Sequence, residues 1–172
     1  MLGDLTEKIQ SSQNKFEKLV ARIPGYAGYK QKEQRREADK LLRLHVAQEY
    51  QDQLARLNEL QYTLTTRGQL GAVSALDRSS SKLQRLIDRI KTASYGYAGL
   101  FDAVKVDEAA LDKLYDFDQA MLDGASSVAA LLDQLAESVS GETDTAAITS
   151  QLAAELDNLN QTFSQRREVI LS

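Results

Sequence analysis

The carboxylates of residues 108–123 come closest to residue types and spacings that could do chemistry. This set, which falls in one predicted helix, comprises Glu108, Asp112, Asp116, Asp118 and Asp123. A di-iron bundle would also need inward-facing Glu-x-x-His pairs, and the chain has one histidine, His45. The chain has no cysteine, which excludes disulfides, thiolate metal sites and a cysteine nucleophile. We therefore predict no catalytic residue, no metal site and no cofactor.

Asp118 differs from the other carboxylates because the helical period places it in the apolar seam of its helix. An unpaired carboxylate is costly there, so we expect an arginine partner such as Arg85 or Arg89 on the preceding helix. A structural ion pair is favoured over catalysis. His45 has Glu49 one helical turn further on and is predicted to lie at the boundary of the core.

A run of cations in residues 30–43 is the candidate basic surface: Lys30, Lys32, Arg35, Arg36, Lys40 and Arg43. Tracking phosphates needs cations in excess, but Glu33, Glu37 and Asp39 are interleaved at helical spacing. The pattern favours a solvated, ion-paired helix face. Nucleic acid is disfavoured as a partner, and an anionic membrane surface stays open. Gly-rich phosphate loops of the types Gly-x-x-x-x-Gly-Lys-Ser/Thr and Gly-x-Gly-x-x-Gly do not occur.

The sequence Gly-Tyr-Ala-Gly occurs twice, at residues 25–28 and 96–99, and each copy follows an amphipathic helical pattern. We call these two segments the elbows. Four tyrosines lie in or beside them: Tyr26, Tyr29, Tyr95 and Tyr97. Tyrosine is common in binding surfaces because its ring is apolar and its tip polar. The alternative is that the rings cap the end of the bundle. As a partner-binding site, the tyrosines are our leading candidate.

Apolar residues at spacings of three and four predict the elements that position these residues. Helices are expected over about 4–23, 29–66, 74–94 and 107–139, and an extra C-terminal helix over 143–170. Gly68 and Gly71 flank one predicted turn, and residues 141–145 form another. A capping box of Ser74 and Asp77 is expected to start the third helix.

The elbows repeat together with the helix before them. Subtracting 71 from Leu76, Ser80, Leu83, Ile87, Ile90 and Ser94 gives Leu5, Ile9, Ser12, Phe16, Leu19 and Ile23. An internal duplication of residues 2–66 as residues 73–137, written helix, elbow, helix, explains this pattern. Two unrelated helix breaks of similar chemistry remain the alternative.

Length and composition bound the fold class. The 172 residues contain one proline, 42% hydrophobic and 27% charged residues, as expected for one folded helical domain over 1–172. Charge is uneven, since residues 1–100 carry 17 Lys/Arg against 11 Asp/Glu and residues 101–172 carry 4 against 14. Oppositely charged halves that lie side by side are favoured over a basic surface for an anionic partner. No signal peptide or membrane span is apparent, which predicts a cytoplasmic protein.

Residues 28–41 and 96–107 resemble segments of a group of uncharacterised bacterial all-helical proteins. The resemblance covers about residues 20–135. It implies a prokaryotic, cytoplasmic origin and the elbows as the family hallmark, and it implies no activity.

We therefore expect an all-α antiparallel bundle of four to five helices. Its expected function is non-catalytic, as an interaction or scaffold protein that binds a protein partner or associates with itself. The alternative is a peripheral membrane-associated protein that uses its basic N-terminal half on anionic lipid.

Overall fold

The computed structural model describes residues 18–19, 21–22, 32–93 and 108–171, with side chains at 18–19, 21–22, 40–93, 113 and 115–166. Four long helices make up this part of the chain: α2 (Lys32–Thr66), α3 (Leu70–Thr92), α5 (Glu108–Ser140) and α6 (Ala146–Leu171). The described residues contain no strand. This confirms the predicted all-α bundle.

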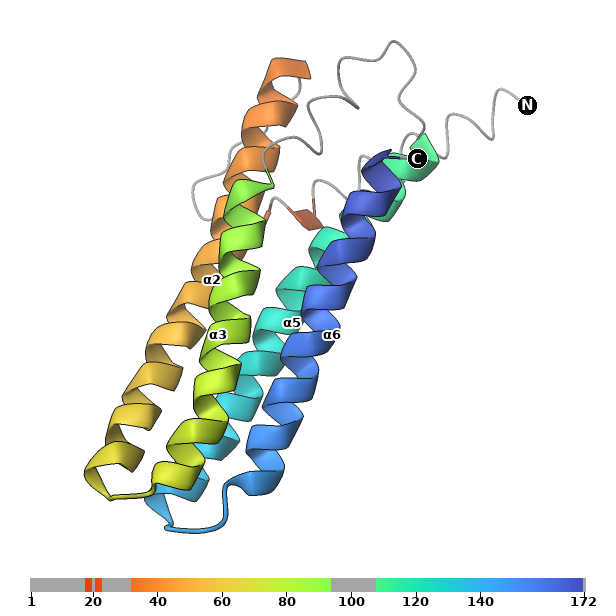
Figure 1. Cartoon of the computed structure of the whole chain (residues 1–172). Helices are drawn as coiled ribbons and strands as arrows, with labels where there is room; N and C mark the ends of the chain where they lie inside the picture. Colours follow the sequence, from red (N-terminus) through yellow and green to blue (C-terminus); the bar gives the residue numbers. More distant parts are fainter. Residues whose placement is uncertain (1–17, 20, 23–31, 94–107, 172) are drawn as a thin grey trace.

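The helices form two hairpins that pack side by side (Figure 1). Each is antiparallel, α2 against α3 and α5 against α6, and α2 also packs on α5 while α3 packs on α6. Helices α2 and α5, which belong to different hairpins, run parallel. Tyr50 contacts Met121, and further along both helices Arg56 contacts Asp133. The helix at 143–170 is therefore part of this bundle. We call the end with the two turns the turn end, and the other the open end.

Both turns end a helix with the same hydrogen-bond pattern, the Schellman motif. At the first, Gly68 has a φ of +72°, and the amides of Gly68 and Gln69 donate to Thr65 and Leu64. At the second, Glu142 takes the left-handed position with a φ of 54°, one residue after Gly141. Glycine has no Cβ to strain there, whereas a glutamate does.

The predicted start of α3 is wrong. The helix begins at Leu70 rather than near Ser74, so Gly71 lies inside it. The left-handed Gly68 reverses the chain so tightly that the Val73 amide already donates to the Gln69 carbonyl. The helix thus begins without a side-chain cap, and Ser74 and Asp77 form no capping box at its start.

The core follows the predicted stripes closely. Leu57, Leu83, Val128 and Leu156, one from each helix, are fully buried. Leu54 and Leu60 are only partly buried against this core. Of the predicted first helix the structure describes little, but Leu19 is 2% exposed and belongs to the core. The bundle therefore buries a continuous apolar seam along its length.

Candidate functional site

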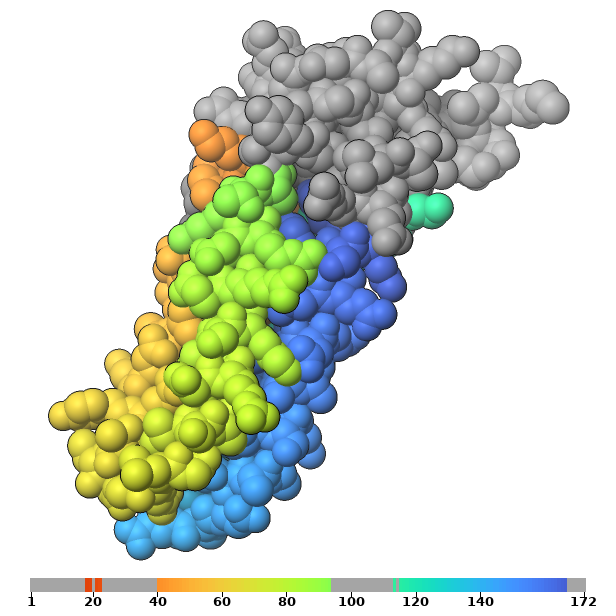
Figure 2. Space-filling view, in the orientation of Figure 1, coloured from red at the N-terminus to blue at the C-terminus, as the bar shows by residue number. Residues whose placement is uncertain are grey.

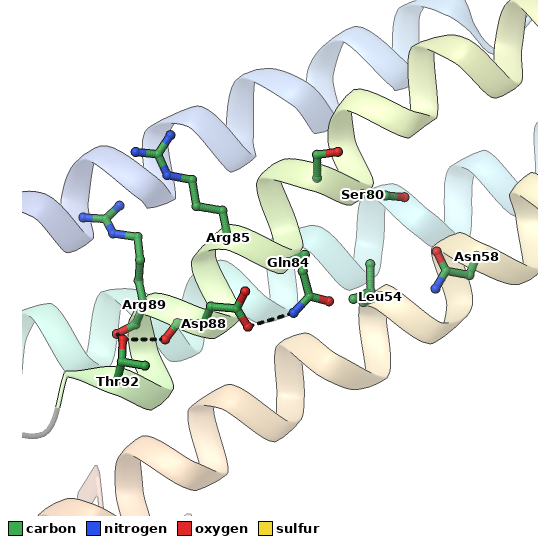
Figure 3. Close-up of a pocket in the computed structure, with 9 residues that line it drawn as sticks. Leu54, Asn58, Ser80, Gln84, Arg85, Asp88, Arg89 and Thr92 are labelled. Carbon is green, nitrogen blue, oxygen red and sulfur yellow. Dashed lines mark hydrogen bonds between the residues drawn. The ribbon is translucent and has the colours of Figure 1, made fainter.

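A groove runs between α2 and α3 on the outside of the bundle (Figure 3). Its volume is about 630 Å³, and all but one of the nine residues that line it are polar or charged: Leu54, Asn58, Ser80, Ser81, Gln84, Arg85, Asp88, Arg89 and Thr92. The Ser80 hydroxyl donates to the Gln61 side-chain oxygen at 3.0 Å. An amide oxygen is too weak a base to activate a hydroxyl as a nucleophile. This contact therefore does not activate the Ser80 hydroxyl.

The two arginines of this groove extend from α3 toward α6, away from α2 (Figure 3). Arg89 donates to the Asn160 carbonyl at 2.8 Å and to the Ser164 hydroxyl at 2.8 Å, and its guanidinium lies 5.1 Å from the Phe163 ring centre. Lys82, two turns earlier, pairs with Asp157 at 2.5 Å. These contacts tie α3 to α6.

Asp118 is buried, as predicted, but its arginine is not on α3. Arg166 of α6 donates from Nε to Asp118 at 3.2 Å, and the side chains are 3% and 7% exposed for Arg166 and Asp118. Arg85 and Arg89, the expected partners, extend from α3 toward α6 (Figure 3), where Arg89 bonds to Asn160 and Ser164. The period of α5 fixed the burial of Asp118, whereas its partner depends on which helix lies beside it.

A close approach of three helices surrounds Gly124, which the sequence analysis did not single out. A Cβ there would lie 2.2 Å from a Leu159 methyl carbon and 2.8 Å from the Tyr50 hydroxyl oxygen. That hydroxyl donates to the Met121 carbonyl at 2.6 Å. Burial, and secondarily the charge of Glu155, raises the pKa of Tyr50 well above its usual range. The signal in the sequence that could have indicated this close approach is a glycine inside a predicted helix, next to the apolar stripe.

The predicted partner-binding tyrosines, Tyr26, Tyr29, Tyr95 and Tyr97, lie outside the described residues, as does Lys30. Three members of the basic surface, Lys32, Arg35 and Arg36, lie in the first turns of α2, where only the backbone is described. Lys40 is exposed and Arg43 half-buried. Because α2 begins at Lys32, these last two residues lie near the open end.

Other predicted positions are also settled. The His45 side chain is 22% exposed, at the core boundary, with Nε2 3.8 Å from Glu49. In the described ranges, no three or more His, Asp or Glu residues gather as a metal site would require. None of the helices described has the length and apolar character to cross a membrane.

The oppositely charged halves of the chain lie side by side, as expected. Five cations of the first half contact the second half. Arg22 pairs with Asp123, Arg56 with Asp133 and Lys82 with Asp157, while Arg67 donates to the Val139 carbonyl and Arg89 to the Asn160 carbonyl. Part of the charge asymmetry is thus used within the fold.

The equivalence of residues 2–66 and 73–137 stays a prediction, because both elbows lie outside the described residues. Comparisons with protein-family models, with curated proteins and with solved structures find no match for this chain.

Proposed function

We propose that this protein is a non-catalytic interaction module, which binds a protein partner or a second copy of itself with the open end of the bundle. The observation that carries the proposal is the exposure of two leucines there, Leu41 at 38% and Leu44 at 46%. They lie three residues apart on α2, so they share a helix face. Lys40 beside them is exposed as well.

The length of α2 supports this location. It has 35 residues against 23 in α3, and a short turn joins the two. About 12 residues of α2, or about 18 Å, therefore extend beyond the last turn of α3. Figure 1 shows this extension past the end of α3. Within the described part of the chain α3 does not cover this extension, and such a helix face can receive a partner helix.

The chain order supports the proposal that the elbow tyrosines belong to the same surface. The described residues closest to the elbows, Lys32 at the start of α2 and Ala93 after α3, both lie at the open end. Aromatic residues are enriched in the cores of protein interfaces, which supports adding the elbow tyrosines to this surface. Tyr26, Tyr29, Tyr95 and Tyr97 are proposed to complete it.

The alternative, binding of anionic lipid by the basic half, has less support. Arg22, Arg56 and Lys82 of that half pair with acids of α5 and α6, which reduces the charge offered to a membrane. This alternative would be favoured if wild type and the glutamate variants of the next paragraph sediment equally with anionic vesicles, and if salt abolishes the binding.

The test is affinity capture from a lysate of the source cells with matched variants. An open-end variant, Leu41→Glu/Leu44→Glu, is compared with a turn-end variant, Tyr62→Glu/Leu70→Glu, which alters residues 73% and 68% exposed. We expect a stoichiometric partner with wild type and the turn-end variant, and at least about tenfold less with the open-end variant. A Tyr26→Ala/Tyr97→Ala variant tests the elbows. Equal recovery by both glutamate variants, with wild-type circular dichroism, would contradict the proposal.

A further inference from the structure

The outer face of α2 carries a stripe of uncharged residues. They recur at alternating steps of three and four: Leu41, Leu44, Gln48, Gln51, Ala55 and Asn58. We call this set the α2 stripe. Five of the six are exposed, and Gln51 is half-buried. Successive helical residues differ by about 100°, so the stripe lies about half a turn from the buried Leu42, Tyr50 and Leu57. It points away from the core, and Figure 2 shows α2 at one edge of the molecule, beside α3.

Charged residues lie at the edges of the α2 stripe. Side chains of α2 are described from Lys40 onward, and among them the exposed charged residues are Lys40, Asp52 and Glu59, none of which is in the stripe. On α3, by contrast, the exposed Arg78 and Arg85 lie seven residues apart, on one line of the helix. Uncharged residues at steps of three and four form the contact seam of a coiled coil. The spacing therefore indicates a helix as the partner of this face.

The α2 stripe and its helix have the same centre. α2 spans Lys32–Thr66, with Glu49 at its midpoint, and the stripe is centred between Gln48 and Gln51. Two copies of α2 placed antiparallel about this centre overlap along nearly their whole length, about 50 Å. A contact between two identical surfaces needs such a two-fold centre. The geometry of α2 therefore fits a second copy of the same helix.

We propose that α2 of one copy packs antiparallel on α2 of a second copy through the α2 stripe. About the shared centre, Leu44 lies opposite Ala55 of the second copy, and Leu41 lies opposite Asn58 of the second copy. A large side chain thus meets a smaller one, which lets the two helices approach evenly. The amides of Gln48 and Gln51 meet at the centre, where polar groups disfavour other registers. A parallel pair would instead set leucine against leucine and alanine against alanine.

The charged edges also fit this alignment. Asp52 comes level with His45 of the second copy, on the same side of the contact. Moving the alignment by seven residues toward the turn end would bring Asp52 level with Asp52 of the second copy, and these like charges would oppose association. The dimer is closed, because each copy has one α2 stripe and uses it in the contact.

This inference rests on the proposed function, because Leu41 and Leu44 of the open end belong to the α2 stripe, and it names a second copy as the partner. The contact continues along α2 to Asn58, away from the two leucines. Tyr62 lies beyond its last layer, so the turn-end variant keeps the whole stripe. A substitution at Ala55 therefore tests the inference separately from the open-end function.

Sedimentation velocity of the purified full-length protein over a range of concentrations is the first test. Wild type is expected to form dimers that do not grow further. Ala55→Glu places a carboxylate opposite Leu44 of the second copy and should weaken dimerisation at least about tenfold. Ala154→Glu is the matched control, because Ala154 is an exposed alanine on α6, and it should dimerise like wild type. Wild type that stays monomeric at about 1 mM, or an Ala55→Glu variant that dimerises like wild type, would overturn the proposal.

Cysteine cross-linking tests the alignment, because the chain has no cysteine of its own. An equimolar mixture of Leu44→Cys and Ala55→Cys should form a disulfide-linked dimer on mild oxidation. Either variant alone should not, since its two cysteines lie about 16 Å apart along the helix axis, beyond the limit of about 7 Å between the Cα atoms of a disulfide. A parallel pair would cross-link each variant alone as efficiently as the mixture, and that result would also overturn the proposal.

Capture from the lysate of the source cells separates this inference from the proposed function. If purified wild type stays monomeric but captures a different protein through Leu41 and Leu44, the proposed function stands and the second copy is the wrong partner. If wild type dimerises with the expected cross-link and Leu41→Glu/Leu44→Glu captures as much protein partner as wild type does, the open-end function fails and the α2 pair stands.

Discussion

We call the part of the bundle from the open end to the level of Gly124 the open half, and the part from there to the turns the turn half. The two halves differ in how the buried polar groups of the core are hydrogen-bonded. In the open half they join different helices, as Arg166 joins Asp118 and the Tyr50 hydroxyl joins the Met121 carbonyl. In the turn half, the buried Thr149 hydroxyl bonds to Thr145, one turn back in its own chain. Ser79 there is fully buried, and its hydroxyl has no partner in the described part of the chain.

This difference indicates where the mutual register of the helices is set. Leucine layers in the turn half supply burial, but a layer shifted by one turn would still be apolar. A hydrogen bond or ion pair between helices has one partner at one height, so it disfavours shifted packings. We interpret the open half as the part that fixes the axial position of α5 against α2 and α6.

The largest effect is expected from breaking the ion pair of the open half. Asp118→Ala leaves the Arg166 charge buried without its carboxylate and should lower the free energy of unfolding by about 3–5 kcal/mol. Urea unfolding followed by circular dichroism measures this loss. The double variant Asp118→Leu/Arg166→Met should lie close to wild type, because apolar replacement of both charges is often neutral. A loss below about 1 kcal/mol in the single variant would contradict a register role.

The boundary between the halves is tested at Gly124. Gly124→Ala should be destabilising by about 1–2 kcal/mol, since overpacking against Leu159 and Tyr50 exceeds the gain in helix propensity. Gly71→Ala is the matched control, because a Cβ at Gly71 has nothing within 4 Å. It should stabilise by up to about 1 kcal/mol. Thermal unfolding of both variants checks the opposite signs, and equal signs would show that Leu159 relaxes freely.

Tyr50→Phe removes the hydrogen bond from the Tyr50 hydroxyl to the Met121 carbonyl. It should lower the free energy of unfolding by about 1 kcal/mol at pH 7. The pKa of Tyr50 is raised in the folded state, so above about pH 10 only the unfolded chain releases this proton. The Tyr50 contribution to stability therefore falls by up to about 1.4 kcal/mol per pH unit as the pH rises.

Urea titrations at pH 9–11 on wild type and Tyr50→Phe should show the stability difference shrinking with pH. Tyr62→Phe, at a side chain 73% exposed, is the control and should change stability by less than about 0.5 kcal/mol at pH 7. A difference that stays constant across the titration would show that the hydroxyl is not held protonated by the fold.

The helical period identified most of this core but not its polar partners. It placed Asp118 inside, because burial follows from position on one helix. It could not choose between Arg89 and Arg166, because that choice depends on the order of helices around the bundle. Ser80 was assigned to the buried stripe of α3 and is half-buried, whereas Ser79 is inside. Adjacent helical positions differ by about 100°, so the edge of a stripe is the least determined part.

The candidate site was less accessible to sequence than the fold. Exposed Leu41 and Leu44 are identified only when the end of α3 is known, since a longer α3 would have covered that part of α2. The elbow tyrosines stand out by composition, but composition says nothing about which way a ring faces. The groove between α2 and α3 depends on side-chain sizes on two helices at once, which one stripe does not encode.

The smallest effect is expected in the turn half, and it has the opposite sign. The Ser79 hydroxyl is removed from water without a hydrogen bond in the described part of the chain, so its burial opposes folding. Ser79→Ala removes the hydroxyl, keeps the Cβ carbon and gains helix propensity, and should stabilise the protein by about 1 kcal/mol. Ser81→Ala, at an exposed hydroxyl that bonds to Asp77 in its own helix, is the control and should gain only the smaller propensity term. If Ser79→Ala instead destabilises the protein in urea unfolding, the turn half also holds a fully buried polar contact between helices, and the contrast with the open half disappears.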